Sequence, residues 1–187
     1  DLELFRDNFK RFMSEHIAPH YEKWEREGIM PRSVWTLLGE NGFLCVDVPE
    51  EYGGYGVPTH YSLMLVEESA RAGYCALSTA ISCHSEIAAP YIQHIGTEEQ
   101  KQYWLPKMVS GEAVGAIGMT EPGAGSDLQA MRTSAILQDD HYLLNGSKTF
   151  ISNGQHADVV VLAVKTDPQA RAKGVSLLLV DTHLDGF

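Results

Sequence analysis

Hydroxyl, glycine and proline residues crowd into one short block, Met119–Asp127, with the sequence MTEPGAGSD. The block follows an apolar run, so it is predicted to be the loop after a buried strand. Gly123 and Gly125 can adopt positive φ, which would let backbone N–H groups converge on an anion, and without a Cβ they let a ligand approach closely. Thr120 and Ser126 add hydroxyls that donate and accept hydrogen bonds. The block predicts an anion-binding loop, although its glycines alone are more typical of a plain turn.

Other phosphate-binding and nucleophile motifs do not match this block. Lys148 and Thr149 do not follow a glycine-rich loop at Walker A spacing, and Leu128 stands where the dinucleotide fingerprint needs its third glycine. Ser126 lies in GAGSD rather than in a G-x-S-x-G elbow, and no histidine is placed beside it by sequence. A kinase-like, Rossmann-type or serine-hydrolase site is therefore not indicated.

A second block, Asn145–Gly154, has the sequence NGSKTFISNG. Its Asn-Gly start is typical of a hairpin turn, and Ser147–Ser152 is predicted to be the strand that follows the turn. Taken alone, Phe150 is interpreted as a core aromatic of that strand.

The segments AIGMTEPGAGSD and LNGSKTFISNG together resemble the flavin-binding middle domain of the acyl-CoA dehydrogenases. Within that family the sequence is most similar to the long-chain and isovaleryl branches, and the resemblance runs through the whole chain. It implies an α+β fold, in which an N-terminal all-α helical domain is followed by a β-barrel-like middle domain. The resemblance also implies that the family's C-terminal four-helix domain is absent from this chain.

The resemblance assigns cofactor roles to individual positions. The segment from Ile117 to Ser126 is expected to wrap the ring and pyrophosphate of FAD, with Thr120 bonded to the pyrimidine side of the ring. Phe150, Ile151 and Ser152 stand where family members often have Trp-Ile-Thr, so the aromatic would cover the flavin edge and the hydroxyl would reach toward N5. The expected FAD-binding residues are Ile117, Gly118, Met119, Thr120, Gly125, Ser126, Phe150, Ile151 and Ser152.

Substrate contacts are also implied by the resemblance. Ser126 is expected to meet the acyl-CoA, and His84 lies on a helix that borders the acyl-chain cavity in the family, although a satisfied polar position between helices is the commoner role of such a histidine. Lys148 is interpreted as an exposed strand lysine, with contact to a CoA phosphate as the alternative.

The implied activity is FAD-dependent α,β-dehydrogenation of a fatty or branched acyl-CoA to a trans-2-enoyl-CoA, as in β-oxidation. Electrons would pass to an electron-transferring flavoprotein, and the full-length protein would form a homotetramer. The family's catalytic glutamate comes from the C-terminal helical domain, so no catalytic residue is assigned here, and nothing around Glu67, Glu68, Glu86 or Glu121 indicates a raised pKa. The alternatives are an acyl-CoA oxidase that uses oxygen and a non-catalytic acyl-CoA-binding or interaction module.

The hydrophobic periodicity divides the chain into two domains. Residues 1–111 are predicted to be helical, with helices at 59–72 and 77–94 and a capping box at Thr97 and Gln100. Pro19 is expected to kink or restart the first helix. Residues 112–187 are predicted to be a β-rich flavin- and acyl-CoA-binding domain, truncated at its end. The predicted strands are 113–119, 132–138, 141–145, 147–152, 158–166 and 174–180, with turns at Asp139-Asp140, Asn145-Gly146 and Asp167-Pro168.

The amino-acid composition excludes several classes of protein but does not identify the function. The chain has 187 residues, 44% hydrophobic content and a formal net charge of −11, which argues against nucleic-acid binding. No apolar stretch reaches the about eighteen residues of a membrane span. Three cysteines without C-x-x-C spacing favour a reduced compartment, either the cytoplasm or the mitochondrial matrix of a eukaryote. His16 and His20 have metal-ligand spacing but no third ligand, so no metal site is expected.

Overall fold

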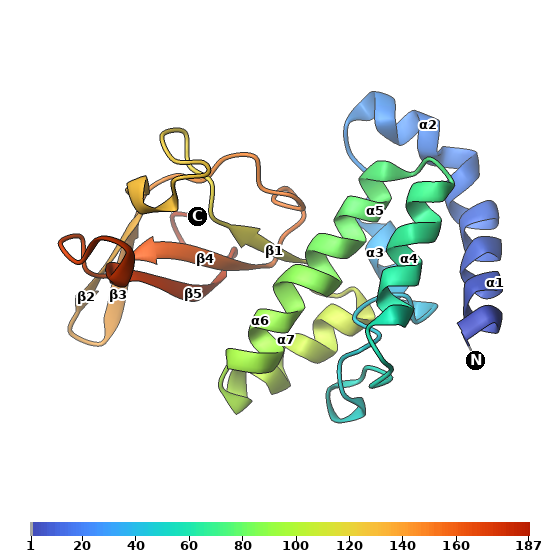
Figure 1. Ribbon diagram of the computed structural model, residues 1–187, viewed down its shortest axis with the longest axis horizontal. Coiled ribbons are helices and arrows are strands. Elements are labelled where there is room, and N and C mark those ends of the chain that lie inside the picture. The colour runs from blue at the N-terminus through green and yellow to red at the C-terminus, as the bar shows by residue number, and fades with distance from the viewer. Residues whose placement is uncertain (1) are drawn as a thin grey trace. The chain divides into compact units, whose positions relative to one another are not determined.

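The computed structural model describes residues 2–187 and divides into two compact units, which meet in sequence at Val114 and Gly115. The first unit is helical and the second is built on a β-sheet (Figure 1). This order confirms the α+β prediction of a helical N-terminal region followed by a sheet domain.

Two long helical segments of the first unit contain a π-helical turn. The first runs through α1 (Leu2–Phe12), the π-helical turn Met13–Ile17 and α2 (Ala18–Glu27); the second runs through α5 (Cys75–Ile81), the turn Ser82–Ala88 and α6 (Ala89–Ile95). A proline, Pro19 or Pro90, is the second residue of the α-helix that follows each π-helical turn. Because proline has no N–H and its ring clashes with the carbonyl four residues earlier, the wider turn lets the helix continue.

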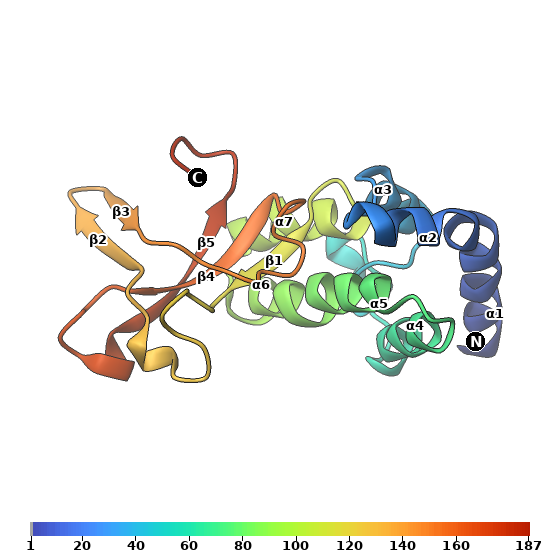
Figure 2. The same ribbon diagram turned by 90° about the horizontal axis from the view of Figure 1, so that it is seen from above.

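The remaining helices of this unit are α3 (Ser33–Glu40), α4 (His60–Arg71) and α7 (Glu98–Ser110). The capping box is confirmed, because the Gln100 N–H donates to the Thr97 hydroxyl and the Gln100 side chain accepts from the Thr97 N–H. The core of the unit is aromatic and aliphatic, with Phe9, Trp35 and Leu65 at most 1% exposed. The view from above shows α5 and α6 in one line, as expected for a helix that continues through its π-helical turn (Figure 2).

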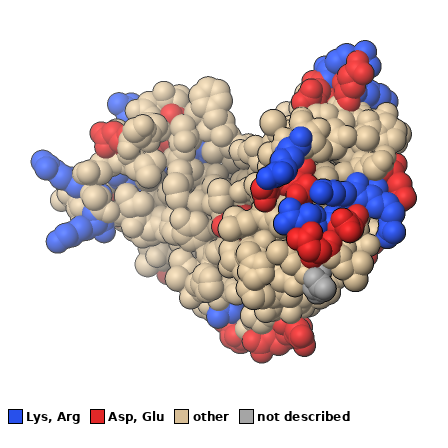
Figure 3. All heavy atoms as spheres, turned by 45° about the vertical axis from the view of Figure 1, so that its right-hand side comes forward, with Lys and Arg blue, Asp and Glu red and all other residues tan. Residues whose placement is uncertain are grey.

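Acidic and basic side chains alternate on the surface of the helical unit. The ion pairs Arg71–Glu67, Arg26–Glu22 and Lys23–Glu27 join them. Lys and Arg lie beside Asp and Glu on the face shown in Figure 3. No helix among the described residues is both long and apolar enough to cross a membrane.

The second unit has five strands: β1 (Gly115–Gly118), β2 (Ser134–Gln138), β3 (His141–Asn145), β4 (Val159–Lys165) and β5 (Val175–Asp181). The sheet order is β1-β4-β2-β3, with β5 on β4. β1 runs parallel to β4, whereas β5 runs antiparallel to it. The six residues Val159–Val164 are all buried, which explains why β4 is the most continuous apolar run of the chain.

Two local predictions were wrong in this unit. Ser147–Ser152 is not a strand, and Asn145–Gly146 is not a hairpin turn. The β2–β3 hairpin instead closes at the predicted turn Asp139-Asp140, where Gln138 pairs with His141. Beyond β3 the chain is irregular because Phe150 and Asn153 adopt φ of 55° and 63°, which an extended strand cannot accommodate.

Candidate functional site

The first motif block starts where β1 ends, so the sheet itself places Met119 and Thr120. The chain then makes a tight turn in which Glu121 and Ala124 exchange two backbone hydrogen bonds across Pro122-Gly123. This turn closes without a left-handed residue.

Neither Gly123 nor Gly125 adopts the positive φ that glycine allows. A Cβ built on either glycine would meet nothing within 4 Å. The protein's own packing therefore does not require glycine at these two positions, and the space beside them is open.

The second motif block presents an aromatic side chain to solvent. Phe150 is 92% exposed and its backbone is left-handed, so the interpretation as a buried strand aromatic was wrong. The next residue, Ile151, points inward and packs on the cluster that contains Val160 and Leu162 of β4. An exposed aromatic in a strained conformation contributes nothing to the core, which makes it a candidate for ligand contact.

The two motif blocks are bonded directly to each other. The Thr149 N–H donates to the Thr120 carbonyl at 2.9 Å. The Lys148 ammonium donates to the Met119 carbonyl at 3.1 Å and to Glu121 Oε1 at 2.8 Å. The side chain of Lys148 is only 8% exposed, so the prediction of an exposed strand lysine was wrong.

The strand β4 carries one block on each of its faces. Ala124 of the first block packs against Ala163, together with Met131. Ile151 of the second block packs on the alternating residues Val160 and Leu162. Because neighbouring strand residues point to opposite faces, β4 fixes the position of one block on each face of the sheet.

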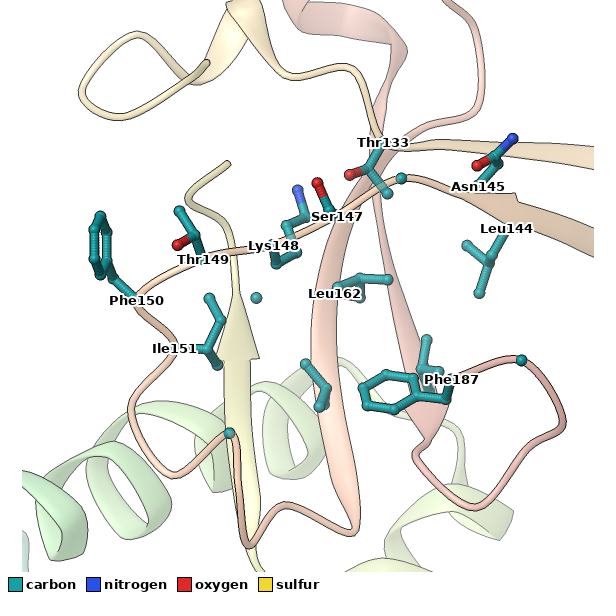
Figure 4. Close-up of a pocket in the computed structure, with 16 residues that line it drawn as sticks. Thr133, Leu144, Asn145, Ser147, Lys148, Thr149, Phe150, Ile151, Leu162 and Phe187 are labelled. Carbon is teal, nitrogen blue, oxygen red and sulfur yellow. The ribbon is translucent and has the colours of Figure 1, made fainter. Parts of the chain in front are cut away.

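A pocket of about 490 Å³ lies beside the second block (Figure 4). Ser147, Lys148 and Thr149 follow one another along it, and Leu162 of β4 contributes an apolar wall. Gly118 also lines it, and a Cβ there would lie 2.7 Å from Leu162 Cδ1. A side chain at position 118 would therefore require the Leu162 side chain to move.

The other predicted cofactor residues lie at or near the edge of the sheet unit. Ile117, Met119 and Thr120 are half-buried, whereas Gly125, Ser126 and Ser152 are exposed. Open glycines, hydroxyls and an exposed aromatic side chain occur together on the two joined blocks. This combination suits a flat aromatic ligand with polar edges and an attached phosphate.

His84 lies in the helical unit, within the π-helical turn between α5 and α6. Its ring is completely buried, 3.0 Å from the Met108 carbonyl through Nε2 and 5.2 Å from the Trp35 ring. Contact between His84 and a substrate is still a prediction that depends on the resemblance.

Sequence reasoning missed two pairs of charged residues. One is Glu121–Lys148. The other is Glu86 with Asp47, where burial and the nearby Asp47 carboxylate raise the pKa of Glu86 to about 7. The Ser62 hydroxyl donates to Glu86. No local pattern could have found either pair, because the partners are far apart in the sequence.

No group of three or more metal-ligating side chains is present among residues 2–187. His16 lies against the Phe12 ring, and His20 lies 5.7 Å from the Trp24 ring, both on the exposed side of their helices.

The fold defines a two-part protein, in which a helical unit precedes a sheet unit whose two bonded motif blocks form the candidate site. Residues 1–112 match the family model "Acyl-CoA dehydrogenase, N-terminal domain", and residues 116–187 match "Acyl-CoA dehydrogenase, middle domain". The chain therefore belongs to the acyl-CoA dehydrogenase family, as the motif resemblance predicted.

Individual relatives agree with the family models. The mitochondrial long-chain specific acyl-CoA dehydrogenase of Sus scrofa is 40% identical over an alignment of 187 positions, which covers 99% of this chain and 43% of that protein. The acyl-CoA dehydrogenase structure from Geobacillus kaustophilus has 50% identity and a TM-score of 0.95, covering 99% of this chain and 49% of its own. A glutaryl-CoA dehydrogenase structure from Mycobacterium smegmatis in complex with FADH2 has 30% identity and a TM-score of 0.90. The match covers 100% of this chain and 47% of that chain. The chain thus spans less than half the length of these relatives.

Proposed function

We propose that this chain is the N-terminal and middle portion of an FAD-dependent acyl-CoA dehydrogenase that converts a fatty or branched acyl-CoA to a trans-2-enoyl-CoA. The observation that carries the proposal is the direct bonding of the two motif blocks, Thr149 to Thr120 and Lys148 to Met119. The blocks come from separate parts of the sheet unit, and the resemblance of both to the family's flavin-binding segments supports their assignment to one flavin site.

The exposed edge of the joined blocks fits FAD. Phe150 offers an uncovered ring face, and Thr120 and Ser152 add hydroxyls within the same two blocks. We assign Phe150 and Ile151 to the apolar cover of the ring, and Thr120 and Ser152 to hydrogen bonds with its polar edges. Ile117, Gly118 and Met119 would support the ring, while Gly125 and Ser126 would lie along the pyrophosphate, where open space leaves room for it.

When bound, FAD supplies the acceptor for a hydride from the acyl chain. The residues of this chain bind and orient it and exclude water from one side. Ser126 and His84 are assigned to the substrate side. No residue of this chain is assigned as the base that removes the α-proton; by family membership that base belongs to a C-terminal helical domain. Within the proposal, the whole protein is a homotetramer of β-oxidation in the cytoplasm or the mitochondrial matrix, and it passes electrons to an electron-transferring flavoprotein.

The test is an anaerobic titration of the full-length protein with short, branched and long acyl-CoAs. A flavin absorption spectrum that bleaches with one of these substrates supports the proposal, and its dependence on chain length identifies the substrate class. Hydrogen peroxide released in air would assign an oxidase instead, and acyl-CoA binding without flavin would assign a binding module. The isolated 187 residues should bind FAD weakly and give no turnover, and steady turnover by them would contradict the assignment of the base.

A further inference from the structure

The Glu121–Lys148 ion pair lies at the junction of the two motif blocks. Its atoms Oε1 and Nζ are 2.8 Å apart, and the side chains are 6% and 8% exposed. Lys148 also donates to the Met119 carbonyl at 3.1 Å. Lys148 thus connects its own block to Met119 and Glu121, the two residues that flank Thr120.

Glu121 extends the same connection to the start of β2. Its Oε2 accepts from the Arg132 N–H at 2.6 Å, and its Oε1 accepts from the Thr133 N–H at 3.0 Å. Both carboxylate oxygens are therefore occupied within the protein. Burial by itself would raise the pKa of Glu121, but the bonds from Lys148 and the two backbone N–H groups lower it to about 2.

A buried ion pair is weak support for stability, because well-packed apolar residues often replace such a pair without loss. Apolar residues cannot, however, replace the directional hydrogen bonds of the pair. Hydrogen bonds from one ammonium to two defined oxygens set the register of the blocks, and hence the place of Thr120 relative to Phe150.

We propose that Lys148, held by Glu121, is a positioning residue of the cofactor site. It keeps the Thr120 segment against the Thr149–Ser152 segment, so that the hydroxyl and aromatic groups are presented together before FAD binds. This inference rests on the proposed function. It concerns two residues that contact each other within the protein and that carry out no chemical step.

The experiment compares FAD affinity and thermal stability in the full-length protein. Lys148→Met is expected to weaken FAD binding by about tenfold or more. The double variant Glu121→Leu with Lys148→Met removes the buried charges together, so its melting temperature should recover while its FAD affinity does not. Glu67→Gln breaks an exposed 2.8 Å ion pair with Arg71 and is the matched control, with no change in affinity.

A milder variant covers the case in which the double variant does not fold. Lys148→Gln keeps a donor of shorter reach, and its FAD affinity should lie between those of the unaltered protein and Lys148→Met. A second readout needs no cofactor: in the FAD-free 187-residue chain, exchange of the Thr149 amide hydrogen should become faster in Lys148→Met.

Recovery of FAD affinity in parallel with stability would overturn the positioning role, and so would unchanged affinity in Lys148→Met. If the unaltered full-length protein binds no FAD, the proposed function fails and the inference fails with it. A protein that binds FAD equally well with and without Lys148 refutes the inference alone.

Discussion

Replacing Glu86 by glutamine should stabilise the helical unit at alkaline pH. In the folded chain, burial and the Asp47 carboxylate raise the pKa of Glu86 from 4.5 to about 7. An acid whose pKa is raised on folding favours the folded state below its unfolded value of 4.5, and that contribution is lost as pH rises through about 7. At pH 8 the native carboxylate is charged and half-buried, whereas the glutamine amide is neutral.

The size of the effect follows from the two pKa values. At about 1.4 kcal/mol per pH unit, the difference sets an upper limit of about 3 kcal/mol. Because the Glu86 carboxyl is only half-buried, solvent screening reduces the expected gain to about 1 kcal/mol. Glutamine keeps a carbonyl oxygen for the Ser62 hydroxyl, so little should be lost at pH 5.

Tryptophan fluorescence during urea unfolding reports on the helical unit, because Trp24, Trp35 and Trp104 all lie in it. The free energies of unfolding should diverge between pH 5 and pH 8, with the variant more stable at pH 8. Glu51→Gln, at an exposed position, is the control and should run parallel to the unaltered chain. A variant that gains no stability at pH 8 relative to pH 5 would refute the reasoning.

Two substitutions at other positions test packing and backbone strain. Gly39→Ala should destabilise the helical unit by about 1–3 kcal/mol in the same assay, because a Cβ there would overlap the backbone carbonyl of Ser110, which cannot move as a side chain can. Phe150→Gly should raise stability by about 0.5–1 kcal/mol in calorimetry, since it relieves a left-handed φ and loses no buried surface. The same change should weaken FAD binding by the full-length protein, and tighter binding would argue against the ring-covering role.

Sequence signals that act within a few residues predicted the structure well. The Thr97 capping box and the Asp139-Asp140 turn are confirmed because each depends on hydrogen bonds or backbone preferences inside one short segment. The continuous apolar run of β4 predicted a strand for the same reason. The Pro19 position was expected to kink or restart its helix, and the π-helical turn before it is the form that this takes.

Predictions failed where long-range contacts decide the conformation. The residues of Ser147–Ser152 have strand-like composition, but Lys148 is drawn to a carboxylate 27 positions earlier and the Thr149 N–H is taken by Thr120. A local pattern cannot weigh these bonds, so it assigned a strand to an irregular segment. The same contacts made Lys148 buried and Phe150 exposed, the reverse of what their positions in a strand predicted.

The two carboxylates that sequence could not distinguish should give the two units opposite responses to acid. Glu86 favours the folded helical unit as pH falls from about 7 toward 4.5. Glu121 has a lowered pKa, so its contribution is present above 4.5 and is lost as pH falls toward about 2.

Amide hydrogen exchange separates the responses, because the Thr133 N–H bonds to Glu121 and the helical amides do not. We compare amide exchange rates after correction for their intrinsic dependence on pH. Acidification from pH 7 to 4.5 should slow exchange in the helical core. The exchange rate of the Thr133 amide should rise only below pH 4.5. If Thr133 loses protection above pH 5, the pair with Lys148 does not hold Glu121 ionised, and the positioning role of Lys148 loses its physical basis.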